Sequence, residues 1–303
     1  MYCGARDTVK HRLYECHHAA EVRAASASSS LIASGLAAPE DDMFYTRGWA
    51  ETPAVAKPIV DAIVKYEIRQ GNIMIPSDPF GFLPQDGDFY PDGSVIFGRQ
   101  DILARGGWGV VQVDESGHPI KAIFGTVPRY FACTPVVAEH LALVNLASRL
   151  VNPVEARVFP DCKATIQIYN KGREDATVHS SNLAGLWLDI FSQDVRPLGT
   201  MSHCKAHRVI DQVPESEKPA VRANDHADVY AKRGAKEHEP SVGDIAAYKV
   251  AESSWRSVMQ LAVAVLPLWP HAQELFGKLT RAANGGPRGR RGPKINPNPH
   301  EFL

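Results

Sequence analysis

The pattern of apolar and polar residues is strand-like from Phe89 onward. Three consecutive runs of apolar and small residues cover residues 89–97, 107–113 and 120–125. The short connection Asp-Glu-Ser-Gly, which contains a glycine, separates the last two runs and is typical of a hairpin. Three strands joined by short connections predict an antiparallel meander.

The segment after the meander carries the signals of a helix start. Thr134 occupies the N-cap position and Pro135 the first helical position, where its missing N–H costs nothing. Glu139 heads a stripe of apolar residues at helical spacing, so its side chain should face the sheet. A carboxylate in that place is costly unless it is paired, protonated or bound to a metal. The stripe consists of Ala142, Leu143, Leu146 and Leu150.

Two strand signals contain an aspartate. Asp92 is followed by glycine and serine, which alone is an ordinary turn signal. Asp161 ends a second strand signal over residues 156–161, and a helix is expected over residues 164–169. This strand-helix-strand-helix order implies parallel pairing. Aspartates at the carboxyl ends of neighbouring parallel strands lie side by side, where open α/β sheets place ligands.

A fourth acidic residue follows on a later helix. Residues 183–190 are amphipathic and predict a helix, and residues 199–206 predict a strand leading to His207. Residues 224–232 are helical in pattern, and Asp228 shares one face of that helix with Ala231 and Ala235. Asp228 therefore lies on a face made of small residues, which can pack closely.

The flanking segments differ from the middle of the chain. Residues 1–50 are rich in small and polar residues and predict a largely disordered leader. Residues 51–84 form an N-terminal extension in which Val55, Ile59, Ile63 and Tyr66 predict a helix within residues 51–70. The remaining expected parts are a domain over residues 85–240, a C-terminal helical extension over 241–283 and a flexible basic tail over 284–303.

Composition excludes several classes of protein. The chain has 303 residues, 44% hydrophobic and 22% charged, with a formal net charge of -1, which disfavours a uniformly basic nucleic-acid binder. Five scattered cysteines without a CxxC pair fit a reducing compartment and disfavour zinc at residues 16–18 or 203–204. No secretory signal or membrane-spanning run is recognised, so we expect an intracellular monomer, in either nucleus or cytoplasm.

Six stretches in order resemble the ribonuclease H type 1 family, of the kind attached to reverse transcriptases of retroelements. The resemblance covers roughly residues 85–240, the size of one domain. Each stretch is weak alone, and the specificity comes from their order. They are Tyr90-Pro91-Asp92-Gly93-Ser94, Ala104-Arg105-Gly106-Gly107-Trp108-Gly109-Val110-Val111, Ala138-Glu139-His140-Leu141-Ala142-Leu143, Phe159-Pro160-Asp161-Cys162, Lys205-Ala206-His207-Arg208 and Asn224-Asp225-His226-Ala227-Asp228-Val229-Tyr230-Ala231-Lys232.

The resemblance implies a five-stranded mixed α/β sheet, with the meander plus parallel strands, flanked by helices. It implies an endonuclease that hydrolyses the RNA strand of RNA-DNA hybrids with two Mg²⁺ ions, for which Mn²⁺ can substitute. The implied metal ligands are Asp92, Glu139, Asp161 and Asp228, and His207 would move protons. The implied partners are the hybrid and a reverse transcriptase domain of a longer polyprotein. Candidate nucleic-acid contacts are Ser94, Arg105, Lys163, Lys205, Arg208 and Asn224.

Two prolines depart from the family pattern. Pro91 and Pro160 precede the strand aspartates, where the family usually has a hydroxyl residue. Each proline removes a donor from a central strand, so a bulge in the sheet beneath the site is expected. Two alternatives stay open: a catalytically impaired module that binds nucleic acid or is a structural remnant of a retroelement polyprotein, and another nuclease or transposase with the same core.

Overall fold

The computed structural model describes residue 3 and residues 6–49, 53–79, 88–150, 156–181, 183–192, 197–206 and 208–268. By internal contacts the chain divides into two compact units. One unit is Pro53–Tyr248, and the other combines Met1–Thr52 with Lys249–Leu303. The predicted basic tail over residues 284–303 lies outside the described residues, as does His207.

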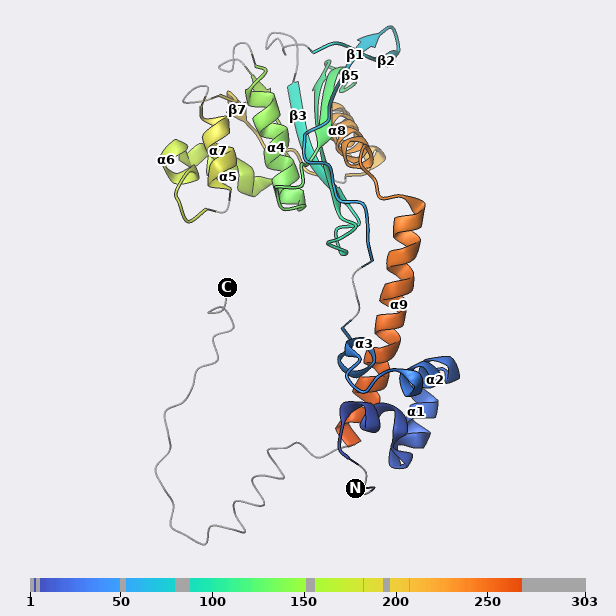
Figure 1. Cartoon of the computed structure of the whole chain (residues 1–303). Coiled ribbons are helices and arrows are strands. Elements are labelled where there is room, and N and C mark those ends of the chain that lie inside the picture. Colours follow the sequence, from blue (N-terminus) through green and yellow to red (C-terminus); the bar gives the residue numbers. More distant parts are fainter. Residues whose placement is uncertain are drawn as a thin grey trace, which may run out of the picture. The chain divides into compact units, whose positions relative to one another are not determined.

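A seven-stranded mixed sheet forms the centre of the unit Pro53–Tyr248, in the order β2-β1-β5-β4-β3-β6-β7 (Figure 1). β3, β4 and β5 form an antiparallel meander, β6 pairs parallel to β3, and β7 pairs parallel to β6. The predicted α/β class is therefore confirmed, with seven strands in place of five. The strands are β1 (Val64–Gln70), β2 (Ile73–Pro76), β3 (Asp88–Ile96), β4 (Arg105–Val113), β5 (Pro119–Thr126), β6 (Arg157–Val158) and β7 (Thr200–Met201).

The helix predicted within residues 51–70 is wrong, because β1 and β2 occupy part of this extension. β1 pairs antiparallel with β5, from Val64 opposite Gly125 to Ile68 opposite Lys121. Val64, Tyr66 and Ile68 alternate with polar residues at the period of a strand. The free edge of β5 offers backbone partners to this stretch, and pairing there outweighs the helical spacing of the apolar residues further upstream.

Glu67 ties β1 to α8 (Lys218–Lys236). Its buried carboxylate accepts hydrogen bonds from the Tyr230 hydroxyl at 2.7 Å and from the Arg233 guanidinium. Burial alone would raise the pKa of Glu67, but these two donors lower it below its usual value. The charged carboxylate is therefore the form that holds β1 against the helix.

Glu67→Gln is expected to lower the free energy of unfolding by about 1–3 kcal/mol, because a buried hydrogen-bonded charge is lost and Arg233 loses its partner. Urea unfolding of the full chain measures this loss. Glu237→Gln is the matched control, since Glu237 pairs with the half-exposed Lys65 at 2.6 Å and such a pair contributes about 0–1 kcal/mol. Equal losses in the two variants would contradict a structural role for Glu67.

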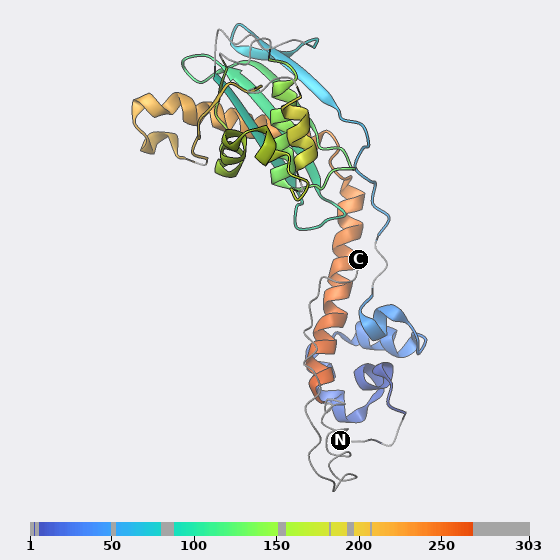
Figure 2. The same cartoon turned by 90° about the vertical axis from the view of Figure 1, so that its left-hand side faces the viewer.

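Helices cover both faces of the sheet (Figure 1). Successive residues of β4 alternate in direction, so Trp108 and Val110 pack under α4 and α7, while Val111 and Val113 pack under α8. Figure 2 shows the same layers from the side. The helices on the α4 face are α4 (Pro135–Ala147), α5 (Lys163–Lys171), α6 (Arg173–Ala176) and α7 (Ala184–Ile190).

The other predicted elements of this unit are present with changed ends. The helix expected over residues 164–169 is α5, and the helix expected over residues 183–190 is α7. The strand expected over residues 199–206 is reduced to the two residues of β7. Two short 3-10 turns, η5 (Ile210–Gln212) and η6 (Glu215–Glu217), lead into α8.

Glycines of β4 let α8 approach the sheet closely. A Cβ on Gly107 would lie 1.9 Å from the backbone nitrogen of Ala235, and a Cβ on Gly109 would lie 2.7 Å from that of Ala231. Both distances are shorter than any side chain allows, so the helix backbone rests on the strand backbone. This contact fixes the height of α8, which carries Asp228, above the sheet.

The other unit is helical, and the predicted disordered leader is wrong. Leu13, Tyr14 and Ala19 are buried together with Leu261 and Val265, so the N-terminal segment finds its apolar partners on a helix near the other end of the chain. None of the helices among the described residues is long and apolar enough to cross a membrane. The helices are η1 (His11–Glu15), η2 (His17–Ala19), α1 (Ala20–Ser26), α2 (Ser29–Ala37), α3 (Met43–Arg47) and α9 (Val242–Val265), which begins in the sheet unit and is followed by η7 (Leu266–Leu268).

Candidate functional site

The register of two parallel strands brings Asp92 and Asp161 together. Phe89 on β3 pairs with Val158 on β6. Asp92 comes three residues after Phe89, and Asp161 comes three residues after Val158. The charge of Asp161 raises the pKa of Asp92, which places the two carboxylates within electrostatic range. Asp92 is in the middle of β3, and Asp161 follows the end of β6, so the two lie at matching positions along this parallel pair. Their common site stays a prediction.

Glu139 reaches the same region from the first turns of α4. Thr134 caps this helix by accepting a hydrogen bond from the Val137 N–H at 3.3 Å. α4 lies directly on β3, because a Cβ on Gly93 would be 2.2 Å from the Glu139 backbone nitrogen. Close packing at the residue after Asp92 therefore seats the start of α4, with Glu139, against the middle of β3.

The Glu139 carboxylate is only partly satisfied. Its Oε2 atom is buried and has no hydrogen-bond partner, an arrangement that costs free energy unless something binds there. Burial raises the pKa of Glu139, a hydrogen bond from the Cys162 side chain lowers it, and the charge of Asp161 raises it again. The net direction is upward, as expected for a buried acid beside another acid.

Asp228 is the fourth acidic residue, on α8. Its charge also raises the pKa of Asp92, so it belongs to the same electrostatic group. Asp228 also forms an ion pair with Lys232 at 2.5 Å. The Lys232 side chain is 53% exposed, so releasing this partner costs little.

Asp92 is the most perturbed member of the group. It is 7% exposed, and its Oδ1 atom accepts a hydrogen bond from the Gly93 N–H at 2.7 Å. Burial and the charges of Asp161, Asp228 and Glu139 raise the pKa of Asp92 to about 8, against the lowering effect of that single hydrogen bond. Without a cation, at least one of these acids holds a proton at neutral pH.

The four acids are grouped but not closed around a common point. Within the part of the chain that the structure describes, no three of them bring carboxylate oxygens within 4.8 Å of one another. The space beside Glu139 and Asp161, which Pro91, Pro160 and Cys162 also line, is about 10 Å³, close to the volume of one water molecule. Mutual repulsion between carboxylates favours such a spread.

The donor set fits a hard divalent cation. Carboxylate oxygens are the ligands that Mg²⁺ prefers, and it is bound through a few of them together with water and substrate phosphate. The buried Glu139 Oε2 without a partner and the buried, protonated Asp92 are both groups that a cation would satisfy. The chemistry of this group of acids is therefore compatible with the expected metal.

The histidine found beside the site is His203, whereas the expected one was His207. His207 lies outside the described residues, so its expected proton-transfer role stays a prediction. His203 lies beside the site instead, with Nε2 at 2.9 Å from the main-chain oxygen of Asp161. Cys162, which hydrogen-bonds to Glu139, is a second residue that sequence reasoning missed. The sequence places Cys162 next to Asp161 and His203 just after β7, but their spacing gives no indication of these contacts.

Two of the six expected nucleic-acid contacts are wrong. Arg105 is 1% exposed, and its guanidinium donates to the carbonyl oxygens of His238, Ile102, Ala104 and Ala56, so it stabilises the fold.

Asn224 is also buried, on the inner face of α8. Arg208 forms an ion pair with Glu217, and Ser94 is half-buried in β3. Lys163 and Lys205 are exposed and remain candidate phosphate contacts.

The expected bulge beneath the site is absent from the β3–β4 pairing. Nine residues of β3 pair with β4 in unbroken register, and Pro91 stands opposite Val110. The parallel pairing between β3 and β6 ends instead just before the prolines, where the Phe159 N–H donates to the Phe89 carbonyl at 2.8 Å. The missing donor of Pro91 therefore shortens this ladder and leaves the meander regular.

Pro91→Thr is expected to raise the free energy of unfolding by about 0.5–1.5 kcal/mol, because the restored N–H can extend the ladder toward β6 by one hydrogen bond. Chemical denaturation of the metal-free chain measures the change. Pro119→Thr at the start of β5 is a control in which a strand proline changes and the ladder between β3 and β6 does not. An unchanged stability in Pro91→Thr would contradict this reading of the ladder.

This chain was compared with known sequences and solved structures. No family model and no curated protein matches this sequence. Solved structures similar to this chain include a type 1 RNase H with the type 2 active-site motif, LC9-RNase H1, at 12% identity and a TM-score of 0.36, over 57% of this chain and 87% of that one. The PFV RNase H domain is 19% identical with a TM-score of 0.37, over 50% of this chain and 95% of that one.

A foamy viral protease-reverse transcriptase in complex with an RNA/DNA hybrid is 14% identical with a TM-score of 0.37. The match covers 53% of this chain and 22% of that one. At these TM-scores, no property of those proteins is assigned to this chain. The chain is similar, over about half of its length, to solved ribonuclease H domains.

Proposed function

We propose that this chain is a metal-dependent endonuclease of the ribonuclease H type, which hydrolyses the RNA strand of RNA-DNA hybrids. The observation that carries the proposal is the electrostatic grouping of Asp92, Glu139, Asp161 and Asp228. These acids come from four separate segments of the chain, and the charges of the other three raise the pKa of Asp92. A buried acid perturbed by several neighbouring acids is typical of a functional site.

The four acids would hold two Mg²⁺ ions, for which Mn²⁺ can substitute. When bound, such a pair activates the attacking water and stabilises the leaving oxygen of the scissile phosphate. The protein's own contribution begins with Asp92, which must lose its proton before it can bind a cation. Asp228 must also exchange its bond with Lys232 for the cation. The loss of the Asp92 proton favours activity at mildly alkaline pH.

The substrate proposal is supported by the order of the six sequence stretches and by exposed cations beside the acids. Lys163 begins α5 two residues after Asp161, and Lys205 follows β7 in the same region. Both could contact backbone phosphates, while contacts to 2′-hydroxyls across the minor groove would distinguish RNA from DNA. In this proposal the chain works beside a reverse transcriptase domain of a longer polyprotein.

A second candidate function is a catalytically impaired module that binds the hybrid without cutting it. Two observations favour it: no three of the described carboxylates lie within 4.8 Å of one another, and Asp228 is bound to Lys232. An intact site would close when cations and substrate phosphate arrive, whereas an impaired one would stay open. The two candidates therefore differ in metal-dependent cleavage and agree in binding.

Comparison of matched duplexes separates these candidates. The full chain is incubated with an RNA-DNA hybrid, a double-stranded RNA and a double-stranded DNA of one sequence, each with Mg²⁺ and with EDTA. We expect Mg²⁺-dependent cleavage of the hybrid alone. Binding of the hybrid without cleavage in Mg²⁺ or Mn²⁺ would favour the impaired module, and cleavage of double-stranded DNA would favour another nuclease of the same core.

A further inference from the structure

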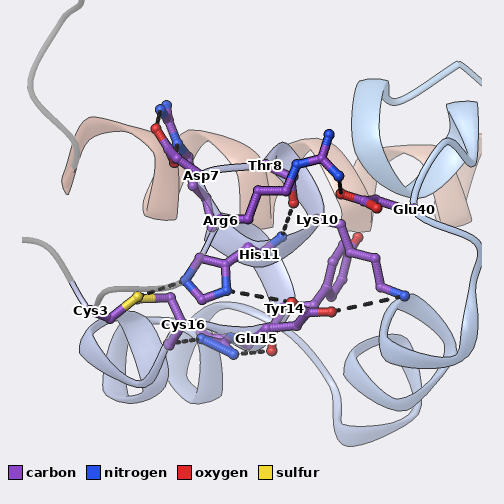
Figure 3. A network of polar contacts seen from close by, with 12 residues as sticks. Cys3, Arg6, Asp7, Thr8, Lys10, His11, Tyr14, Glu15, Cys16 and Glu40 are labelled. Carbon is purple, nitrogen blue, oxygen red and sulfur yellow. Dashed lines mark hydrogen bonds and ion pairs between the residues drawn. The ribbon is translucent and has the colours of Figure 1, made fainter.

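A second group of ligand-type side chains lies in the helical unit, away from the four acids in sequence. The Cys3 Sγ, His11 and Cys16 Sγ donor atoms all lie within 4.8 Å of one another, and Figure 3 shows the three side chains turned toward a common point. Cys3 Sγ is 2.9 Å from His11 Nε2. Among the described residues, this is the only group of three or more histidine, cysteine or acidic side chains that is so close.

The local backbone explains why these residues meet. His11–Glu15 is a π-helical turn, closed by a hydrogen bond from the Cys16 N–H to the His11 carbonyl at 2.8 Å. This wider turn places Cys16 beside His11, and π turns of this kind occur often at functional sites. The turn starts where Thr8 accepts a hydrogen bond from the His11 N–H at 3.0 Å. Cys3 then completes the group from the beginning of the chain.

A second layer of polar groups orients the histidine. Glu15 Oε2 lies 3.4 Å from His11 Nδ1, on the side of the ring opposite Cys3 (Figure 3). A carboxylate in that position holds the proton on Nδ1 and leaves the Nε2 lone pair directed at the cysteines, as in many metal-binding histidines. Lys10 Nζ lies 4.0 Å from the Glu15 carboxylate. The tautomer needed for metal binding is therefore supported by the structure around it.

Positively charged side chains stand beside the group. Arg23 is 6% exposed and donates to the main-chain oxygens of Tyr14 and Cys16. One divalent cation with two thiolates would be neutral, so metal binding would place no additional net charge in this buried region.

We propose that Cys3, His11 and Cys16 form a zinc site that fastens the beginning of the chain to the helical unit. Two thiolates and one imidazole form a donor set that binds zinc in preference to Mg²⁺. In tetrahedral zinc coordination the sulfur and nitrogen ligands are roughly 3.6 Å apart, so Cys3 would move away from His11 by about 0.7 Å. Binding releases one proton from each thiol, and the fourth coordination position is open to water.

Such a site answers a physical need of this unit. Among the residues described for this unit, the buried apolar cluster has five members: Leu13, Tyr14, Ala19, Leu261 and Val265. Small units of this kind depend on metals or disulfides because a limited core contributes little free energy. The sequence spacing of the three ligands, seven and then four intervening residues, matches no common zinc motif, which is why the pattern alone pointed away from zinc.

Metal analysis of the tag-free full chain tests the site. The chain is purified under reducing conditions, loaded with Zn²⁺ and freed of excess metal. We expect about one tightly bound zinc per chain, as for one tetrahedral site. Replacement of zinc by Co²⁺ should give the intense visible bands of tetrahedral cobalt and a sulfur-to-cobalt charge-transfer band. Zinc loading should also raise the thermal unfolding midpoint.

Variants assign the ligands. Cys3→Ser and the double variant Cys3→Ser/Cys16→Ser should lose the charge-transfer band, whereas Cys133→Ser, a change outside the group, should retain it. Glu15→Gln should keep the band and weaken zinc binding by about 10–100-fold, the usual effect of a group that orients a ligand. Cys3 is partly exposed, so Cys3→Ser should keep the fold, and circular dichroism of this variant checks it.

Three results would overturn the proposal. The first is an unmodified chain that binds less than a tenth of an equivalent of zinc after loading. The second is a Cys3→Ser variant that is folded and keeps the full cobalt spectrum. The third is a Cys3–Cys16 disulfide that persists in the purified reduced chain, detected by mass spectrometry before and after alkylation, because a disulfide would occupy both sulfur ligands. None of these results depends on nuclease activity.

Discussion

Asp92→Asn is expected to abolish hybrid cleavage and, at the same time, to stabilise the metal-free protein above neutral pH. Loss of a metal ligand should lower the cleavage rate by more than about a hundredfold, since even groups that only orient ligands contribute 10–100-fold. The gain in stability has a different cause. Asn carries no charge to bury, whereas Asp92 is buried among Asp161, Asp228 and Glu139.

The sign of the pH dependence follows from the pKa values. Burial and the neighbouring acids raise the pKa of Asp92 from its ordinary value of 3.8 to about 8 in the folded protein. The folded state therefore holds a proton that the unfolded state releases, and stability falls as the pH rises from about 4 to about 8. The fall is complete above pH 8, with an upper bound on the order of 6 kcal/mol. Asp92→Asn should remove this fall, and thermal unfolding between pH 4 and 9 in EDTA measures it.

Asp114→Asn is the matched control, because its pKa shift has the opposite sign. Asp114 accepts hydrogen bonds from the Ser116 and His118 N–H groups, at 3.0 Å each, and pairs with Arg69 at 2.5 Å. Burial alone would raise the pKa of Asp114, but these contacts together lower it below its usual value. The variant should lose stability above about pH 4 and keep its cleavage rate. A common response of both variants would contradict the assignment of Asp92 to a functional site.

Gly93→Ala should destabilise the sheet unit by about 3 kcal/mol or more, at the upper end of what overpacking costs. The new Cβ would lie 2.2 Å from the Glu139 nitrogen and 2.6 Å from the Ala138 carbonyl carbon. Both are helix backbone atoms, so α4 as a whole must move away from β3. Cleavage should fall with stability, because the movement separates Glu139 from Asp92. Urea unfolding and hybrid cleavage of the same preparation measure the two effects.

Gly185→Ala separates this clash from a general effect of replacing glycine. Gly185 lies within α7, and a Cβ there meets no atom within 4 Å. Alanine should stabilise the helix by about 0.5–1 kcal/mol and leave cleavage unchanged. If Gly93→Ala were as stable and active as Gly185→Ala, α4 could not be seated on β3 as the structure places it.

The meander and α4 could be predicted because their signals are local. Thr134 and Pro135 mark a helix start on their own, and the parallel order of β3 and β6 follows from the connecting helix. β1 could not be predicted in this way, because its strand state depends on the edge of β5, about sixty residues further along the chain. Local periodicity contains no information about such a partner.

The helical unit and the role of Arg105 were missed for related reasons. Leu13 and Tyr14 are buried by Leu261 and Val265, which are about 250 residues away in sequence. A segment with few apolar residues looks disordered until that partner is known. Arg105 stands in a stretch that resembles a nuclease family, which suggested phosphate binding, but its carbonyl partners and its burial are visible only in the fold.

Cleavage of a hybrid by the full chain tests the central claim, that the four carboxylates form a metal-dependent nuclease site. The RNA strand and the DNA strand carry different end labels, and the reaction is followed at pH 8 with Mg²⁺, with Mn²⁺ and with EDTA. We predict internal cleavage of the RNA strand alone, dependent on the metal and absent from Asp92→Asn. Cleavage that persists in Asp92→Asn or in EDTA, or no cleavage with either metal, would contradict the account.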